Sequence, residues 1–172
     1  LKNVTFEDNS SLTVWYKDMF EKCGALSNID TGKNSMLKSI YCSFNSTAVT
    51  EIDFSNCYLL SYIDDDCFYK NSKIEYVNLD NTNLSTLQAT FYSCSNLVSV
   101  ALPDSLYRIY NNTFSYCISL KDINLDNVVM IGDYAFKGCT SLGYTPQSAE
   151  VKSNDIFEYY ELNDSITVKS VI

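Results

Sequence analysis

The chain has 172 residues, of which 46% are hydrophobic and 19% are charged, and this composition indicates a folded domain or a short repeat array rather than a disordered chain. It contains no histidine, which excludes Ser-His-Asp and Cys-His catalysis and every histidine-containing metal site. The formal net charge of -9 at pH 7 disfavours binding to nucleic acid or anionic lipid, and no apolar stretch is long enough for a membrane-spanning helix.

Two apolar phrases alternate along the chain with a steady period. The anchor phrase is Phe-x-x-Cys-x-x-Leu, and the strand phrase, Leu-x-x-Ile-x-Leu, ends in the alternating pattern of a short strand with one buried face. Steps of 24, 24, 23, 23 and 22 residues separate the phenylalanines of successive anchor phrases. These are Phe20, Phe44, Phe68, Phe91, Phe114 and Phe136. A recurrence at this period predicts a solenoid in which each repeat forms one coil.

The chain starts within a strand phrase. Leu1, Val4 and Phe6 match the phrase, but no anchor phrase precedes them. We therefore expect the array to begin in mid-repeat and the parent protein to have at least one more coil upstream, because an uncapped solenoid end exposes apolar surface. Short strands are predicted around the central residues of the strand phrases, which are Val4, Ile29, Ile52, Val77, Val100 and Ile123.

Each strand phrase is followed by a turn and a second, shorter apolar phrase, such as Leu106 with Ile109. Two repeats depart from the pattern. Thr31 takes the place of the third apolar strand residue, and the repeat that holds Phe44 lacks the cysteine and is one residue short. We expect local irregularity at these positions and no change of fold.

The period ends at Leu142. Residues 143–146 are predicted to form a last, broken strand. In residues 147–172, the segments 156–162 and 165–171 could pair as a hairpin. This part is predicted to be either a C-terminal cap or the start of a further module.

Four of the seven cysteines occupy one column of the repeat, whose members are Cys23, Thr47, Asn71, Cys94, Cys117 and Cys139. The column accepts a small, weakly polar residue, so we expect these cysteines to be buried and inert. Cys42, Cys57 and Cys67 lie off the column and are the candidates for disulfides or exposed thiols. Zinc sites use cysteine pairs about two to four residues apart, a spacing that does not occur, and no metal or cofactor site is predicted.

The run Asp64-Asp65-Asp66 is the densest concentration of charge. Three carboxylates in one turn could hold a hard cation such as calcium, but the glycine and glutamate of a calcium-binding loop do not follow. We favour the interpretation of a solvated turn.

The strand pattern also predicts which side chains form a binding surface. Residues on either side of the central apolar position point away from the core, and stacked coils align them into an extended, polar and mildly acidic row. Such a row suits a broad protein or glycan partner better than a small substrate, and the alternative is a face that is merely soluble. The residues predicted to bind the partner are Asn28, Asp30, Glu51, Asp53, Tyr76, Asn78, Ser99, Asp122 and Asn124.

The segments Phe91–Pro103 and Ile131–Leu142 closely resemble the BspA-like subclass of leucine-rich repeats, and the resemblance covers roughly residues 1–146. It implies an α/β fold, namely a right-handed β/α superhelix with a parallel β-sheet on the concave face and short helical turns on the convex side. Proteins of this family are typically displayed on the surface of bacteria and parasitic protists, where several resemble adhesins for host matrix or cell-surface proteins.

We therefore predict a non-enzymatic recognition or adhesion module that is extracellular or on a cell surface. It is expected to act as a monomer on a protein or glycan ligand, such as a host matrix or cell-surface protein. The alternative is an intracellular scaffold for protein-protein interaction. Unpaired thiols throughout would favour the scaffold, because disulfides persist mainly in oxidising compartments.

Overall fold

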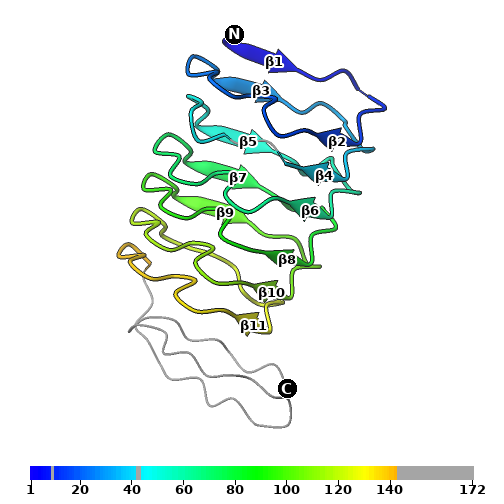
Figure 1. The fold of residues 1–172 in the computed structure, drawn as a ribbon. Helices are drawn as coiled ribbons and strands as arrows, with labels where there is room; N and C mark the ends of the chain where they lie inside the picture. The colour runs from blue at the N-terminus through cyan, green and yellow to red at the C-terminus, as the bar shows by residue number, and fades with distance from the viewer. Residues whose placement is uncertain (9, 42–43, 143–172) are drawn as a thin grey trace.

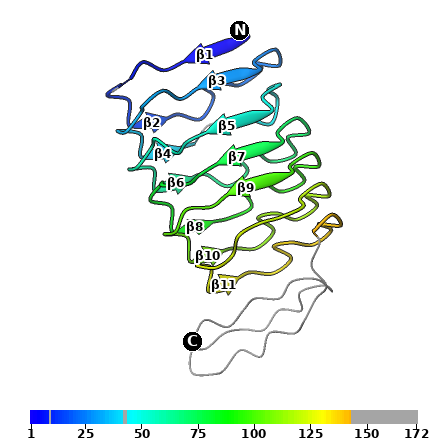
Figure 2. The same ribbon diagram turned by 180° about the vertical axis from the view of Figure 1, so that it is seen from behind.

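The computed structural model describes residues 1–8, 10–41 and 44–142, which wind into a β-solenoid of about five turns. Three-residue strands stack in one column and two-residue strands stack in another, as both views show (Figures 1 and 2). The long strands are β1 (Asn3–Thr5), β3 (Asn28–Asp30), β5 (Glu51–Asp53), β7 (Tyr76–Asn78) and β9 (Ser99–Ala101). The short strands are β2 (Val14–Trp15), β4 (Ser39–Ile40), β6 (Tyr62–Ile63), β8 (Thr86–Leu87), β10 (Arg108–Ile109) and β11 (Met130–Ile131).

The strands pair in parallel, and equivalent residues of successive repeats lie opposite one another. Tyr76 on β7 lies opposite Glu51 on β5 and opposite Ser99 on β9. The central residue of each of these strands is buried, and its neighbours point outward. The predicted strands therefore form, except that the one around Ile123 is reduced to a single bridge between Asp122 and Ser99.

Each column of strands is interrupted once. The long strands form the sheets β1-β3 and β5-β7-β9, and the short strands form β2-β4-β6 and β8-β10-β11. The first interruption falls at the repeat that is one residue short, where the Thr31 hydroxyl donates to the Asp53 carbonyl at 2.6 Å. The second falls where the segment between the two columns shortens by one residue, from Phe54–Ile63 to Leu79–Leu87. The first interruption confirms the irregularity expected at the short repeat, whereas the second was not expected. A missing residue shifts the backbone donors of one coil relative to the acceptors of the next.

The predicted helical turns are wrong, because the described residues contain no helix and the fold is a β-solenoid. Each anchor phrase forms successive turns, as from the Cys94 amide to the Phe91 carbonyl at 3.1 Å. Two residues after the phenylalanine, Ser93 has a left-handed backbone with φ 57°, a conformation that a right-handed helix cannot contain. Its amide donates to the Ser115 carbonyl of the next coil at 2.7 Å instead. The residues with left-handed backbone in this column are Lys22, Lys70, Ser93, Tyr116 and Gly138.

A ladder of phenylalanine rings runs through the core, as the repeat predicts. Neighbouring anchor rings are stacked, with centroids between 4.8 and 5.3 Å apart. At the N-terminal end, where the coils are longer, the core also encloses Trp15, whose ring stacks on Phe6 at 4.7 Å and contacts Phe54 at 5.6 Å. Each coil therefore packs against the coils on both sides of it, and this stacking buries one continuous core along the solenoid.

The cysteine column forms a second ladder, made of hydrogen bonds. Each thiol donates to the carbonyl of the anchor phenylalanine one coil earlier, at 2.9 Å for Cys94, 3.1 Å for Cys117 and 3.0 Å for Cys139. The Asn71 side chain makes the same contact with its amide nitrogen at 2.6 Å. Burial raises the pKa of the Cys94 and Cys139 thiols to about 12. The core prediction is confirmed for these three cysteines, whereas Cys23 is half-buried.

Two of the three off-column cysteines, which were expected to form disulfides or to be exposed, are buried, so the exposed alternative is wrong for these two. Cys57 and Cys67 are 0% and 2% exposed. Cys57 is a thiol, and burial together with the Asp53 carboxylate raises its pKa to about 11. Cys57 follows the last apolar residue of its strand phrase, Phe54, by three residues. Thr82 follows Leu79 by the same interval and is also buried, so the two residues belong to a second column of small core residues. Cys42 lies outside the described residues.

The C-terminal predictions concern residues 143–172, which also lie outside the described residues. The last broken strand, the cap or further module and its hairpin therefore stay predictions, as does the division of the chain after residue 146.

Candidate binding face

The structure places all nine predicted binding residues on one side of the solenoid. They form two columns of outward side chains, one before and one after the central residue of each long strand. Seven of the nine are exposed, and Asn78 and Ser99 are half-buried. We call this surface the long-strand face and define it by these nine residues together with Asn3, Thr5 and Ala101. That it binds a partner stays a prediction.

The second column of the face has a structural task that the sequence reasoning missed. Each of its Asp or Asn side chains accepts a hydrogen bond from the backbone amide two residues later, which turns the chain at the end of the strand. The acceptor to amide distances are 2.9 Å for Asp30, 2.8 Å for Asp53, 3.0 Å for Asn78 and 2.9 Å for Asn124. These residue types are therefore explained in part by turn formation, and one oxygen of each is already used.

Ala101, one of two residues in this column that are neither Asp nor Asn, supports this explanation. Two residues after it stands Pro103, which has no backbone N–H to donate. An acceptor at position 101 would have no donor to meet, and alanine stands there. An Asp or Asn that ends a predicted strand, unless proline follows two residues later, was the signal that could have revealed these turns.

The first column carries the face's exposed aromatic residue. The Tyr76 ring is 48% exposed and is flanked in register by Glu51 on one side and Ser99 on the other. Ser99 is small, so it leaves the neighbouring ring accessible. Beyond it the Asp122 carboxylate accepts from the backbone amide of Ile123 at 2.9 Å.

The face is acidic, and its strands carry no lysine or arginine. The two ion pairs found among the described residues lie outside it. They join Lys22 to Glu21 at 3.1 Å and Lys33 to Asp8 at 3.7 Å. Neither pair includes Asp30, Glu51 or Asp53 of the face.

Sequence reasoning missed a group of aromatic side chains on the short-strand column. Tyr62 on β6 is 40% exposed, and its ring lies 5.1 Å from that of Tyr41. On β10 the Arg108 guanidinium lies 5.1 Å from the Tyr110 ring and donates to the Tyr110 hydroxyl at 2.8 Å. Tyr107 flanks the same guanidinium at 5.8 Å. The signal that could have revealed this surface is the residue just before the buried end of each second apolar phrase, such as Tyr62 before Ile63 and Arg108 before Ile109. These side chains contact one another, so the surface is explained by its own contacts.

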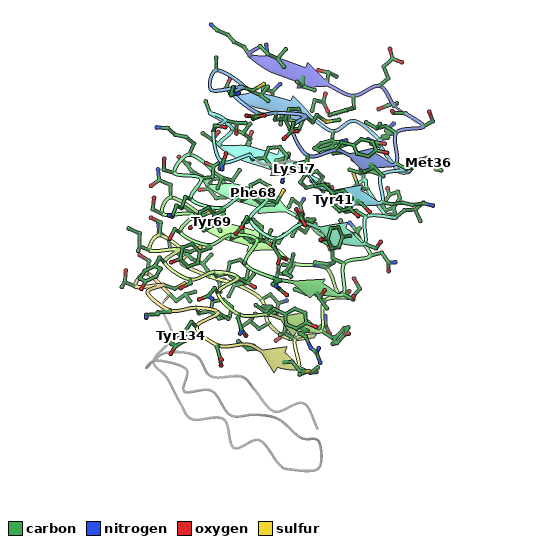
Figure 3. All side chains as sticks on the ribbon, viewed as in Figure 1. Lys17, Met36, Tyr41, Phe68, Tyr69 and Tyr134 are labelled. Carbon is green, nitrogen blue, oxygen red and sulfur yellow. The ribbon has the colours of Figure 1, made fainter. Side chains whose placement is uncertain are left out.

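A second set of tyrosines lines the turn edge, which is formed by the anchor phrases. The rings of Tyr69 and Tyr92 stack at 5.2 Å, Lys70 lies 4.7 Å from the Tyr69 ring and Lys137 lies 4.9 Å from the Tyr134 ring. Figure 3 shows Tyr69 and Tyr134 on this edge and Tyr41 on the other side of Phe68. Because cations of the same chain already cover these rings, the edge is explained by its own contacts.

The acidic run 64–66 is held by its neighbours. The Tyr62 hydroxyl donates to Asp64 and the Gln88 amide donates to Asp65, both at 2.7 Å. Burial, and next the charges of Asp64 and Asp66, raise the pKa of Asp65. Within the described ranges no group of three or more Cys, Asp or Glu is placed to hold a metal ion, so the calcium interpretation gains no support.

Residues 1–8, 10–41 and 44–142 include no helix with the length and the apolar character needed to cross a bilayer.

Two solved proteins are similar to this chain. A solved leucine-rich repeat protein from Bacteroides ovatus is 22% identical with a TM-score of 0.48, over 83% of this chain and 48% of its own. A solved leucine-rich cell surface protein from Faecalibacterium prausnitzii is 20% identical with a TM-score of 0.41, over 83% of this chain and 52% of its own. The chain thus spans about half the length of these solved proteins. No curated protein matches it.

The family itself follows from the repeats. The model of the BspA type leucine-rich repeat region matches in six copies, over residues 1–90 and 61–171. These two ranges include nearly every residue of the chain. The protein therefore belongs to the BspA-type leucine-rich repeat family.

Proposed function

We propose that this protein is a non-enzymatic recognition module that binds a protein or glycan partner through the long-strand face. The repeat family is generally non-catalytic, which supports the absence of an enzymatic role. We further propose that the module acts at a cell surface on a host matrix or cell-surface molecule, and that it does so as a monomer. The placement at a cell surface rests on the family resemblance.

One observation carries the proposal. The parallel register aligns outward polar side chains of successive coils into two columns, with the exposed ring of Tyr76 near their middle. Extended surfaces of this kind are the ones with which solenoids bind partners. An exposed aromatic residue near the centre of such a surface is the residue type that dominates interface energetics.

The test presents the protein to a panel of matrix proteins, cell-surface proteins and glycans, and remeasures every hit with single variants. Tyr76→Ala should weaken binding more than Asp122→Asn, whose effect should fall mostly on the association rate at low salt. Tyr16→Ala is the matched control, because Tyr16 is 70% exposed and follows β2 in the other column. Unaltered binding by both Tyr76→Ala and Asp122→Asn would contradict the proposal and move the site away from the long-strand face.

A second candidate is the intracellular scaffold, which one observation favours. Cysteines 23, 57, 94, 117 and 139 are thiols in the structure, as expected of a protein kept in a reducing compartment. The thiols can be counted on protein isolated without reducing agents and then unfolded. Seven reactive thiols would favour the scaffold, whereas a lower count, restored by reduction, would favour the extracellular module.

A further inference from the structure

The long-strand face has no cation on its strands, whereas acidic side chains occur both on and off the face. On the face the ionised side chains are all acidic, namely Asp30, Glu51, Asp53 and Asp122. Among the cations of the described chain, Lys70 and Lys137 lie on the turn edge, Arg108 lies on the short-strand column, and Lys33, in the turn after β3, pairs with Asp8. Lys2 and Lys121 stand just before the first and last strand positions, so the middle of the face has a single sign of charge.

The carboxylates in the middle of the face are held in place before any partner arrives. Asp30 and Asp53 each have one oxygen fixed by the backbone amide of the following turn, which leaves the other oxygen outward. They stand in successive coils of the second column, on either side of the interruption between β3 and β5. Groups that are fixed in advance lose little side-chain freedom on binding.

Beside them lies an exposed aromatic ring. In the β5-β7 pair, Tyr76 stands directly opposite Glu51, and the ring is 48% exposed. A guanidinium or ammonium group can lie over a tyrosine ring and at the same time pair with a neighbouring carboxylate. The small side chain of Ser99 on the other side of the ring leaves room for such a group.

We propose that the partner of the long-strand face is a cationic polypeptide segment, and that one of its Arg or Lys side chains occupies the position between Glu51 and the Tyr76 ring. This inference rests on the proposed function and specifies its partner class. Charge complementarity selects the cationic polypeptide, since an acidic glycan would be repelled by the face and a neutral glycan would leave its carboxylates uncompensated.

The test uses a labelled peptide of alternating Arg and Gly, with an Asp-Gly peptide of equal length as the negative control, and follows fluorescence anisotropy. At about 0.15 M salt, where long-range attraction is screened, the Arg-Gly peptide should bind and the Asp-Gly peptide should not. The double variant Glu51→Gln with Asp53→Asn should weaken binding at least about tenfold. Asparagine retains the turn acceptor at position 53, as Asn78 and Asn124 show, so the fold is preserved.

The matched control is the double variant Asp18→Asn with Asp66→Asn, which removes two exposed charges that lie off the long-strand face, each two residues before an anchor phenylalanine. It has the same formal net charge as the face variant and should change binding less than about twofold. Tyr76→Ala should weaken binding and Tyr16→Ala should not. An equal loss of affinity in both double variants would mean that the peptide is attracted by net charge alone, and it would overturn the proposal. Failure of the Arg-Gly peptide to bind wild type at this salt concentration would also overturn it.

The outcomes separate this inference from the proposed function. A glycan that binds wild type and is lost with Tyr76→Ala, while the Arg-Gly peptide does not bind, would refute the cationic partner and keep the long-strand face as the binding surface. If the Tyr76 and Asp122 variants bind the panel partners as wild type does, and the Glu51 and Asp53 double variant binds the peptide as wild type does, both the cationic partner and the proposed function are refuted.

Discussion

Replacing Phe114 with alanine tests the central packing element of the solenoid. The ring is fully buried and stacks on Phe91 at 5.3 Å and on Phe136 at 5.2 Å, with planes 7° and 14° from parallel. A buried phenyl ring removes at least about 150 Å² from water, which is roughly 4 kcal/mol at about 25 cal/mol per Å². Two lost stacking contacts add to this cost, and relaxation of the neighbouring rings reduces it. We expect Phe114→Ala to lower the free energy of unfolding by about 4 kcal/mol, within the range of other buried Phe truncations.

The assay is urea unfolding, followed by far-UV circular dichroism and by the fluorescence of Trp15, the single tryptophan. Trp15 lies in an N-terminal coil and Phe114 in a late one, so coincident shifts of both signals would mean that the array unfolds as one unit. Ile118→Ala is the control, because Ile118 is 47% exposed and its truncation should change stability by less than about 0.5 kcal/mol. A loss below about 1 kcal/mol for Phe114→Ala would refute the buried ladder.

Three further predictions concern the cysteine column, the strand-end turns and the left-handed positions. Burial raises the pKa of the Cys117 thiol well above its usual value, so the thiol should resist a thiol reagent until the protein unfolds. The stability that the protonated thiol contributes is fully present below about pH 9 and should be lost as the pH rises further. Asp53→Ala should cost about 1 kcal/mol in urea unfolding, because the Ser55 amide loses its acceptor, and Asp53→Asn should restore most of it. Gly138→Ala should lower the free energy of unfolding by more than about 1 kcal/mol, since φ is 75° and a Cβ would lie 2.8 Å from the Tyr116 ring. Gly24→Ala is the control, because a Cβ there would meet only an ordinary contact at 3.5 Å.

Each of these predictions has an outcome that contradicts it. Rapid labelling of Cys117 in the native protein would place the thiol at the surface. The same pH dependence in Cys117→Ser, which has no thiol to ionise, would assign the loss of stability to other groups. An Asp53→Ala variant as stable as Asp53→Asn would remove the turn as the reason for the second column, and equal effects of the two glycine substitutions would disprove the steric argument.

The repeat made much of this structure predictable. Because the anchor phenylalanines recur at almost equal intervals, each ring must occupy the equivalent place in the next coil, and the ladder from Phe20 to Phe136 follows. The same argument located Cys94, Cys117 and Cys139 in the core and the two columns of the long-strand face on its surface. Periodicity predicts which residues share a column, whatever the backbone does between columns.

Other features depend on backbone details that the pattern does not contain. The helical turns were expected from the resemblance, but residues with left-handed backbone such as Ser93 and Tyr116 interrupt a helix. In that column only Gly138 is a residue type that indicates a left-handed conformation in the sequence. Cys57 was expected to be exposed or bonded because it lies off the main column, whereas its turn directs it into a second column of small buried residues.

The sequence by itself determined the repeat, the family, the buried ladders and the side of the solenoid that carries the candidate binding residues, since all of these depend on recurrence along the chain. Only the tertiary structure decided how the coils are joined. The thiol of Cys117 meets the carbonyl of Phe91, and the Thr31 hydroxyl meets that of Asp53. Partners more than twenty residues apart are brought together by stacking. A difference of one residue in coil length shifts these donors and acceptors, which is why the sheets break where they do. The short repeat indicated the first break in advance, whereas the break between β6 and β8 became visible only in the structure.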